Sequence, residues 1–226
     1  MQPHGDPGHR GSTARFQQVA AVLRHLCKLA SIAAIALYGC SAHAVAVDVV
    51  VTDRGGNPLA DAVVTLVPTT GHLPVQPMSG VEIAQVHRQF SPKVTIVTVG
   101  TAIAFPNADT VRHHVYSFSP VKTFELKLYA GVPAAPVVFD KPGIAVLGCN
   151  IHDEMVAWVV VVDTPLYARS AANGKARVEG VPAGNYELRV WHSERSEPGA
   201  PSSTPLVVGN VDIQTRAALV TRGSRR

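Results

Sequence analysis

One short segment of the chain carries three side chains that bind soft metals. Within GCNIHDEM, residues 148–155, Cys149, His152 and Met155 follow one another at intervals of three positions. A thiolate and two imidazoles, with a weak thioether on the axis, form a type 1 copper site. The segment therefore supplies every ligand of such a site except one imidazole.

The missing imidazole is expected on a neighbouring strand upstream of this segment. FPNADTVRHHVYSF, residues 105–118, offers two adjacent histidines, His113 and His114. Successive residues of a strand face opposite sides of a sheet, so only one of the two can point at the metal.

Cysteine usage draws attention to the same segment. Of the chain's 3 cysteines, Cys27 and Cys40 lie near the N-terminus and only Cys149 lies further along. A single thiol in an oxidising compartment needs either deep burial or a ligand that holds it as thiolate. We therefore expect Cys149 to bind a metal.

Residues 1–44 have the features of a secretory signal peptide. Arg24 and Lys28 precede the apolar run LASIAAIALYG, and the pattern Ala-His-Ala ending at Ala44 suits signal peptidase. The apolar run is too short to span a bilayer, so we predict cleavage and a periplasmic protein. The sequence LYGC at Cys40 also resembles a lipoprotein processing site, and membrane attachment is expected only if Cys40 is lipidated.

The charge of the chain gives no sign of nucleic-acid binding. The formal net charge is only +4, and the basic residues of the C-terminal tail do not form the broad basic face that nucleic-acid binding requires. We interpret this tail as a solvated end. Its arginines are Arg216, Arg222, Arg225 and Arg226.

The remaining pattern predicts an all-β fold. With 17 prolines and 18 glycines, the chain suits short strands and tight turns better than long helices. Apolar runs at 46–53 and 59–68, separated by the turn DRGGNP, are predicted to form a hairpin. The ligand segment falls between predicted strands at 143–149 and 155–163, so a tight loop is expected to carry it.

Residues 90–163 resemble the cupredoxins, in particular plastocyanin and amicyanin. The shared features are a strand ending at F-x-N (residues 105–107), a histidine before a valine segment, and Cys-x-x-His followed by a methionine. The gap between His152 and Met155 matches the short ligand loop of amicyanin. The resemblance implies a Greek-key β-sandwich with one type 1 copper. The copper ligands that it implies are His113, Cys149, His152 and Met155.

Two residues depart from the cupredoxin pattern. His114 stands where the family usually has an asparagine, whose side chain ties the two ligand loops together. Ile151 stands where proline often precedes the loop histidine. A histidine can make one hydrogen bond of the kind that the asparagine makes.

The two flanks resemble a different β-sandwich, the carboxypeptidase regulatory-like or transthyretin-like module. VDVVVTDRGGNPLADAVVTLVP and ARVEGVPAGNYELRVW match its opening and closing strands. We predict that residues 45–77 and 164–226 form one small sandwich around a cupredoxin domain at 78–163, after a signal peptide at 1–44. Chains of this kind are similar to proteins grouped under methylamine utilisation.

The resemblance implies an exported one-electron carrier rather than an enzyme, with redox partners such as a periplasmic dehydrogenase or a cytochrome. A periplasmic copper-binding or delivery protein and a metal-free β-sandwich interaction module are the alternatives. Zinc held by Cys149, His113, His152 and Asp153 fits less well, because structural zinc usually recruits more than one cysteine. A Cys149 nucleophile with His152 as base lacks an oxyanion hole and an orienting third group.

Overall fold

The computed structural model describes residues 45–133, 135–195 and 200–224. The predicted signal peptide, with Cys27 and Cys40, lies outside this part of the chain. The described residues belong to one compact unit, His43–Arg226, and their fold is all-β, with strands and a single short 3-10 helix, η1 (Arg222–Ser224). Within these ranges, no helix combines the length and the apolar character needed to cross a membrane.

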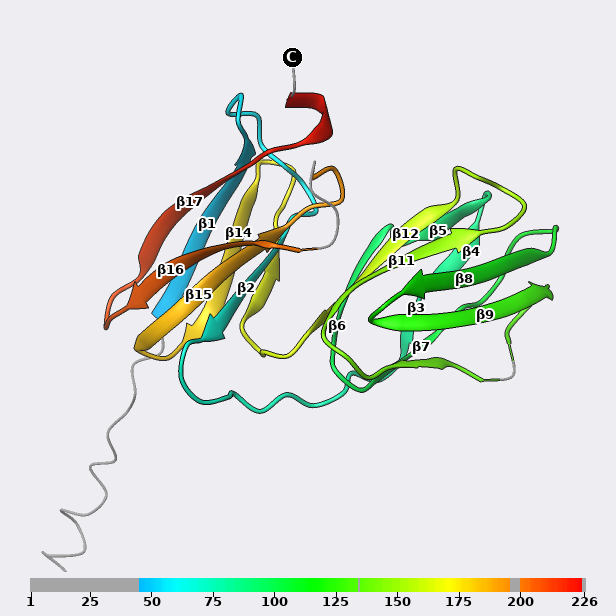
Figure 1. The fold of residues 1–226 in the computed structure, drawn as a ribbon, viewed down its shortest axis with the longest axis horizontal. Helices are drawn as coiled ribbons and strands as arrows, with labels where there is room; N and C mark the ends of the chain where they lie inside the picture. Colours follow the sequence, from blue (N-terminus) through cyan, green and yellow to red (C-terminus); the bar gives the residue numbers. More distant parts are fainter. Residues whose placement is uncertain (1–44, 134, 196–199, 225–226) are drawn as a thin grey trace, which may run out of the picture. The chain divides into compact units, whose positions relative to one another are not determined.

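Two sheets from the middle of the chain enclose one hydrophobic core, and we call them the central sandwich. One sheet has the strand order β6-β12-β11-β8-β9 and the other β10-β7-β3, with β4 and β5 paired separately (Figure 1). Buried side chains such as Phe105, Phe139 and Leu147 fill the space between them. The strands are β3 (Val81–Glu82), β4 (Ala84–Val86), β5 (Gln89–Ser91), β6 (Val94–Thr98), β7 (Thr101–Ala104), β8 (His113–Ser119), β9 (Lys122–Tyr129), β10 (Val137–Phe139), β11 (Gly143–Cys149) and β12 (Val156–Val162).

The segments on either side of the central sandwich together form two further sheets, which we call the flanking sandwich. Their strand orders are β14-β1-β17 and β13-β2-β15-β16, and a second core cluster that includes Val47, Leu66 and Leu188 lies between them. The strands are β1 (Val45–Asp53), β2 (Val63–Pro68), β13 (Tyr167–Arg169), β14 (Lys175–Val181), β15 (Gly184–Trp191), β16 (Ser202–Val208) and β17 (Ile213–Leu219).

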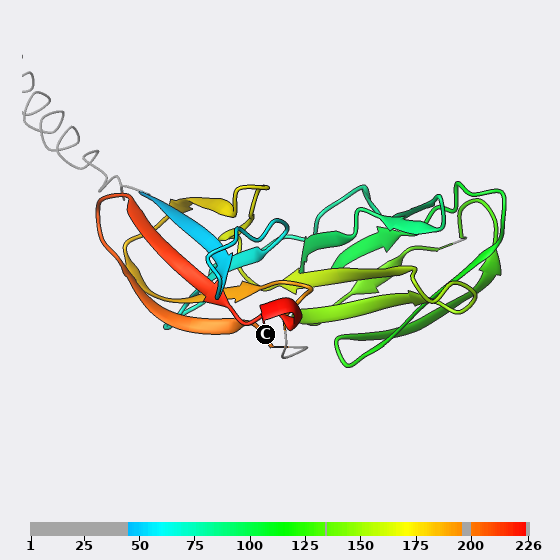
Figure 2. The ribbon, with the colours of Figure 1, turned by 90° about the horizontal axis from the view of Figure 1, so that it is seen from above.

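The predicted hairpin of the first two runs is wrong. β1 and β2 belong to different sheets, although the turn between them forms as the sequence indicates. β1 pairs antiparallel with β14 and parallel with β17, which lies beside it in both views (Figures 1 and 2). Strand β1 alternates buried and less buried residues, and strands far along the chain satisfy its backbone because they enclose the same core.

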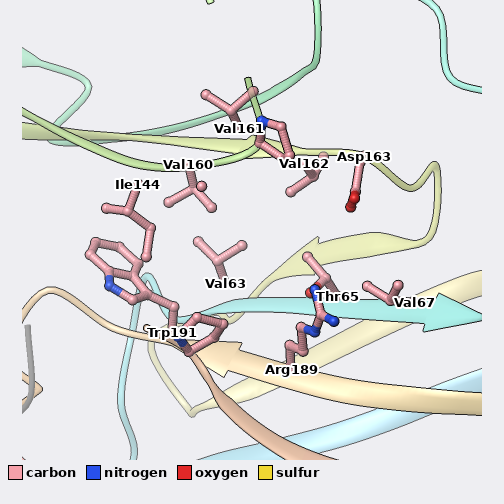
Figure 3. Close-up of a pocket in the computed structure, with 13 residues that line it drawn as sticks. Val63, Thr65, Val67, Ile144, Val160, Val161, Val162, Asp163, Arg189 and Trp191 are labelled. Carbon is pink, nitrogen blue, oxygen red and sulfur yellow. The ribbon is translucent and has the colours of Figure 1, made fainter. Parts of the chain in front are cut away.

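A cavity of about 220 Å³ lies away from the predicted ligands. Its walls are largely apolar, and Ile144 and Val160 face Val63 and Trp191 across it (Figure 3). Neither Cys149 nor any of the histidines lines this cavity. This cavity is therefore not the predicted metal site.

Candidate metal centre

The register of two neighbouring strands brings His113 to Cys149. Cys149, the last residue of β11, lies opposite Val115 of β8. His113 is two positions from Val115 and therefore lies on the same face of β8, where both side chains are completely buried. Nδ1 of His113 lies 3.9 Å from Sγ of Cys149.

The loop between β11 and β12 brings the second histidine to the same sulfur. The amide of Met155 donates to the carbonyl of His152 over 3.0 Å, and the amide of Val156 donates to Glu154 over 3.1 Å. These bonds close a tight turn that folds the His152 ring back over Cys149, with Nδ1 of His152 3.9 Å from Sγ. The sequence predicted this loop between two strands, and the structure contains it.

The three side chains form a cluster that can hold a metal ion. One ligand atom from each of His113, Cys149 and His152 lies within 4.8 Å of the other two, and the two imidazole rings meet edge to face with centroids 5.1 Å apart. Within the described residues, this is the cluster of histidine, cysteine and acidic side chains that satisfies such a distance. Cys149 is 4% exposed and forms no disulfide.

The spacing of the donors is close to that required around a single metal ion. Metal–sulfur bonds of about 2.3 Å and metal–nitrogen bonds of about 2.0 Å, as in zinc sites, place the two donors ~3.7 Å apart at a 120° angle and ~3.5 Å apart at a tetrahedral angle. Both sulfur–nitrogen distances are 3.9 Å. They exceed both values by ~0.2–0.4 Å, so small shifts of the three donors would let them hold one metal ion in either arrangement.

Met155 is positioned by the same turn and is fully buried. Its side chain lies in the hydrophobic core cluster that contains Cys149. The thioether is a soft, weak ligand of the kind found on the axis of type 1 copper sites, and it is compatible with an apolar environment. The donor set of thiolate, two imidazoles and a nearby thioether therefore fits copper.

The other residues considered from the sequence do not join the cluster. His114 faces the opposite side of β8, where its Nε2 lies 3.0 Å from Oε1 of Glu125. This contact to β9 lacks hydrogen-bond geometry, so Nε2 of His114 has no hydrogen-bond partner within the described part of the chain. Asp153 and Glu154 are exposed, and Asp153 is not among the clustered side chains.

One residue of the site was missed from the sequence. Oδ2 of Asp109 lies 2.7 Å from Nε2 of His113, on the side of the ring away from Cys149. Burial opposes ionisation of Asp109, but hydrogen bonds from the Arg88 amide, the His113 ring and the His87 amide outweigh it, so the pKa of this carboxyl lies below its usual value. The signal was an acidic residue four positions before the candidate ligand.

A polar network of Tyr129, Gln85 and the Phe105 carbonyl lies next to His113. The hydroxyl of Tyr129 donates to the Phe105 carbonyl over 2.6 Å and also contacts Nε2 of Gln85. Tyr129 pairs with His113 across β8 and β9. Burial raises the pKa of Tyr129 to about 12; the hydrogen bond with Gln85 opposes this shift, and the negative charge of a Cys149 thiolate adds to it.

Comparisons with known proteins give structural likenesses only. No protein-family model matches the chain. No curated protein matches it either. A purple cupredoxin from Nitrosopumilus maritimus is 21% identical over 36% of this chain and 99% of its own length, with a TM-score of 0.33.

Two other solved structures are similar at the same level. An oxidised mutant of amicyanin is 21% identical over 36% of this chain and 81% of its own, with a TM-score of 0.33. A copper-containing nitrite reductase from Thermus scotoductus is 24% identical over 50% of this chain and 28% of its own, with a TM-score of 0.34. The all-β fold and the ligand cluster rest on the strands and distances of the chain itself.

Proposed function

We propose that this chain is an exported type 1 copper protein that carries one electron at a time between redox partners and is not an enzyme. The observation that carries the proposal is the buried thiol of Cys149 with an imidazole Nδ1 at 3.9 Å on each of two sides. A thiol that is merely a small core residue does not need two histidines directed at its sulfur.

Each ligand has a distinct role in this proposal. Cys149 would supply the thiolate, His113 and His152 would supply neutral imidazoles through Nδ1, and Met155 would supply a weak thioether contact that helps set the potential. When bound, a copper ion supplies the chemistry by changing between two oxidation states that differ by one electron. The strands β8, β11 and β12 hold the ligands in place, which limits their rearrangement between the two states.

Electron exchange would use the edge of His152. His113 is completely buried, whereas the side chain of His152 is partly exposed. Ile151 beside it is 49% exposed, and Asp153 and Glu154 are also at the surface. A partner can approach this loop closely, and the two carboxylates favour a partner with basic residues.

The location and the partners are part of the proposal. The signal-peptide pattern in residues 1–44 supports export to the periplasm, with membrane attachment only if Cys40 is lipidated. A periplasmic dehydrogenase and a cytochrome are the classes of partner that we propose, following the resemblance to cupredoxins. We also propose that the flanking sandwich is a transthyretin-like docking or anchoring module, in a chain of the kind grouped under methylamine utilisation.

The first experiment loads the full chain with copper(II) and records its visible and electron paramagnetic resonance spectra beside those of Cys149→Ser. We expect an intense thiolate-to-copper band and a narrow copper hyperfine splitting, both lost in the variant because serine offers no soft thiolate. A colourless protein that binds zinc or nothing would overturn the proposal. The control is Asp153→Ala, an exposed change in the same loop that should keep both signals.

A second experiment separates a carrier from a copper delivery protein, since the two share every ligand. The copper-loaded chain is reduced and reoxidised repeatedly in the presence of a competing copper(I) chelator, and bound copper is measured after each cycle. A carrier retains its copper over many cycles, because its ligands are held by paired strands. Transfer of copper to the chelator within the first cycles would favour delivery.

A further inference from the structure

Asp109 joins the candidate metal centre to a separate hairpin. Its carboxylate accepts a hydrogen bond from the amide of His87 at 2.6 Å and from the amide of Arg88 at 2.9 Å. The oxygen that accepts from Arg88, Oδ2, also lies 2.7 Å from Nε2 of His113. Its side chain is 13% exposed, and that of His113 is 0% exposed, so this contact is largely shielded from water.

We propose that Asp109 is a positioning residue that fixes the tautomer and orientation of His113 and couples this ring to the tip of the β4–β5 hairpin. The proposal rests on the proposed copper function, because copper is the group that Nδ1 of His113 would meet. Asp109 does not itself reach the metal cluster. It acts through His113.

The hydrogen bond decides which nitrogen of His113 is free. A carboxylate is an acceptor, so Nε2 must carry the proton and donate it to Asp109. The lone pair of a neutral ring then lies on Nδ1, the atom directed at Cys149 at 3.9 Å. A hydrogen bond to the far nitrogen also makes the ligating nitrogen more basic and holds the ring plane.

The hairpin end of the link is strained, and Asp109 compensates for that strain. Val86 pairs with Gln89, so His87 and Arg88 form a two-residue turn, with φ of 53° and 58°. Such a turn favours Asn-Gly, because positive φ is unfavourable for residues with a larger side chain. Both turn amides are satisfied by the one carboxylate of Asp109.

Hydrogen bonds to and from Asn107 fix the position of Asp109 in its loop. Its amide donates to Oδ1 of Asn107 over 3.0 Å. Nδ2 of the buried Asn107 donates to the carbonyls of Val111 and Tyr129, each over 2.9 Å. The loop between β7 and β8 is therefore held at several points around Asp109, which limits the positions that its carboxylate can take.

The test must separate positioning of His113 from simple support of the hairpin. We would place Asp109→Ala in two backgrounds of the full chain, the natural one and one with His87→Asn and Arg88→Gly. Asn-Gly forms the turn without help from a carboxylate, so the second background keeps the hairpin intact when Asp109 is removed. Asp153→Ala in the same backgrounds controls for the loss of one negative charge near the site.

Two measurements are made on each variant. Nitrogen NMR of His113 in the metal-free chain reports the tautomer without any need for copper, and competition with a chelator reports copper(I) affinity. With Asp109 present, we expect the tautomer with the proton on Nε2. In Asp109→Ala, we expect a mixture of tautomers and a loss of at least about tenfold in copper(I) affinity in both backgrounds.

Either of two results would overturn the proposal. One is a natural chain in which Nε2 of His113 is not the protonated nitrogen. The other is Asp109→Ala in the Asn-Gly background with an unchanged tautomer and an affinity within about twofold of Asp153→Ala, which would limit Asp109 to the hairpin. Failure of the copper function shows separately, as a natural chain without a type 1 spectrum, while the tautomer result still decides the role of Asp109.

Discussion

Sγ of Cys149 lies 3.9 Å from Nδ1 of His113, although 36 positions separate the two residues in the sequence. The antiparallel pairing of β8 with β11 makes this contact, because it sets Cys149 opposite Val115. The alternation of a strand then decides which of two adjacent histidines faces the thiol. His114, one position further, faces Glu125 instead.

Because His113 faces Cys149 and His114 faces Glu125, replacing each histidine should affect copper binding differently. His113→Ala removes one of the three strong ligands of the proposed copper site, so we expect the type 1 visible band to disappear in a copper(II) titration. His114→Ala removes a buried ring that contacts Glu125 and packs against Tyr116, so the band should remain while the free energy of unfolding falls by about 1–3 kcal/mol. Loss of the band in His114→Ala, with its retention in His113→Ala, would reverse the ligand assignment.

Gly148 is predicted to accept a side chain only if the ring of Tyr116 moves, because Tyr116 covers it. A Cβ on Gly148 would lie 2.7 Å from both Cζ and Oη of Tyr116, across the β8–β11 pair that also positions Cys149. We expect Gly148→Ala to lower the free energy of unfolding by about 1–3 kcal/mol. Urea unfolding of the metal-free chain measures this change.

A double variant tests whether Tyr116 is the cause. Adding Tyr116→Ala to Gly148→Ala removes the clash, so the two effects should be non-additive by about 0.5–3 kcal/mol, with the double variant more stable than the sum predicts. Strictly additive effects would show that the cost of Gly148→Ala arises elsewhere, for example in the β11 backbone. The Cys149 band of the copper-loaded double variant then reports whether the site has recovered.

The local parts of the site follow from the residues alone, whereas the non-local parts needed either the resemblance to cupredoxins or the structure. The loop carrying Cys149, His152 and Met155 follows from spacing and flanking apolar runs. The upstream histidine required a partner strand. Residue alternation reduced the choice to His113 or His114 without saying which, and the resemblance to cupredoxins was needed to name His113. Asp109 was missed because its role depends on a hairpin at residues 84–91, and nothing local to Asp109 reveals that contact.

The same limit explains the error in the first hairpin. The turn between β1 and β2 is encoded by Gly and Asn residues, and it forms. Which strands pair is decided by the core that they share, and β1 takes as partners β14 and β17, more than a hundred positions away. Turn chemistry predicts a change of direction but does not predict whether the next strand stays in the same sheet.

The flanking sandwich contains a matched pair of glycines that separates backbone strain from steric clash. Gly174 and Gly180 have φ of 75° and 72°. A Cβ on Gly174 would lie 2.4 Å from the Val51 carbonyl oxygen, whereas a Cβ on Gly180 would meet nothing within 4 Å. We expect Gly180→Ala to cost about 1 kcal/mol through strain alone and Gly174→Ala to cost about 3 kcal/mol or more.

Thermal or urea unfolding of the two variants checks this difference. The type 1 spectrum below the unfolding transition should be unchanged in both variants, because neither residue belongs to the central sandwich. Equal costs for the two variants would mean that β1 and the segment at Gly174 move apart and so relieve the clash between the added methyl group and the Val51 carbonyl. A changed copper spectrum in Gly174→Ala would instead show that the flanking sandwich influences the ligands.

The raised pKa of Tyr129 predicts a decrease in the free energy of unfolding at high pH. Its folded pKa of about 12 lies above the value of about 10 expected in the unfolded chain. The unfolded state therefore releases this proton first, and the stabilising contribution is complete below pH ~10 and declines as the pH rises toward ~12. We expect Tyr129 to account for a decrease of about 1–2 kcal/mol in the free energy of unfolding over this interval.

The comparison with Tyr129→Phe isolates this contribution from the other groups that titrate in the same range. Phenylalanine lacks the hydroxyl that donates to the Phe105 carbonyl, so the variant should be less stable near neutral pH by about 1 kcal/mol. Since it has no proton to lose, its stability should fall less steeply between pH ~10 and ~12, and the two curves should converge. Parallel curves over that interval would show that the hydroxyl of Tyr129 titrates at an ordinary pKa and that its burial carries no penalty for the charged form.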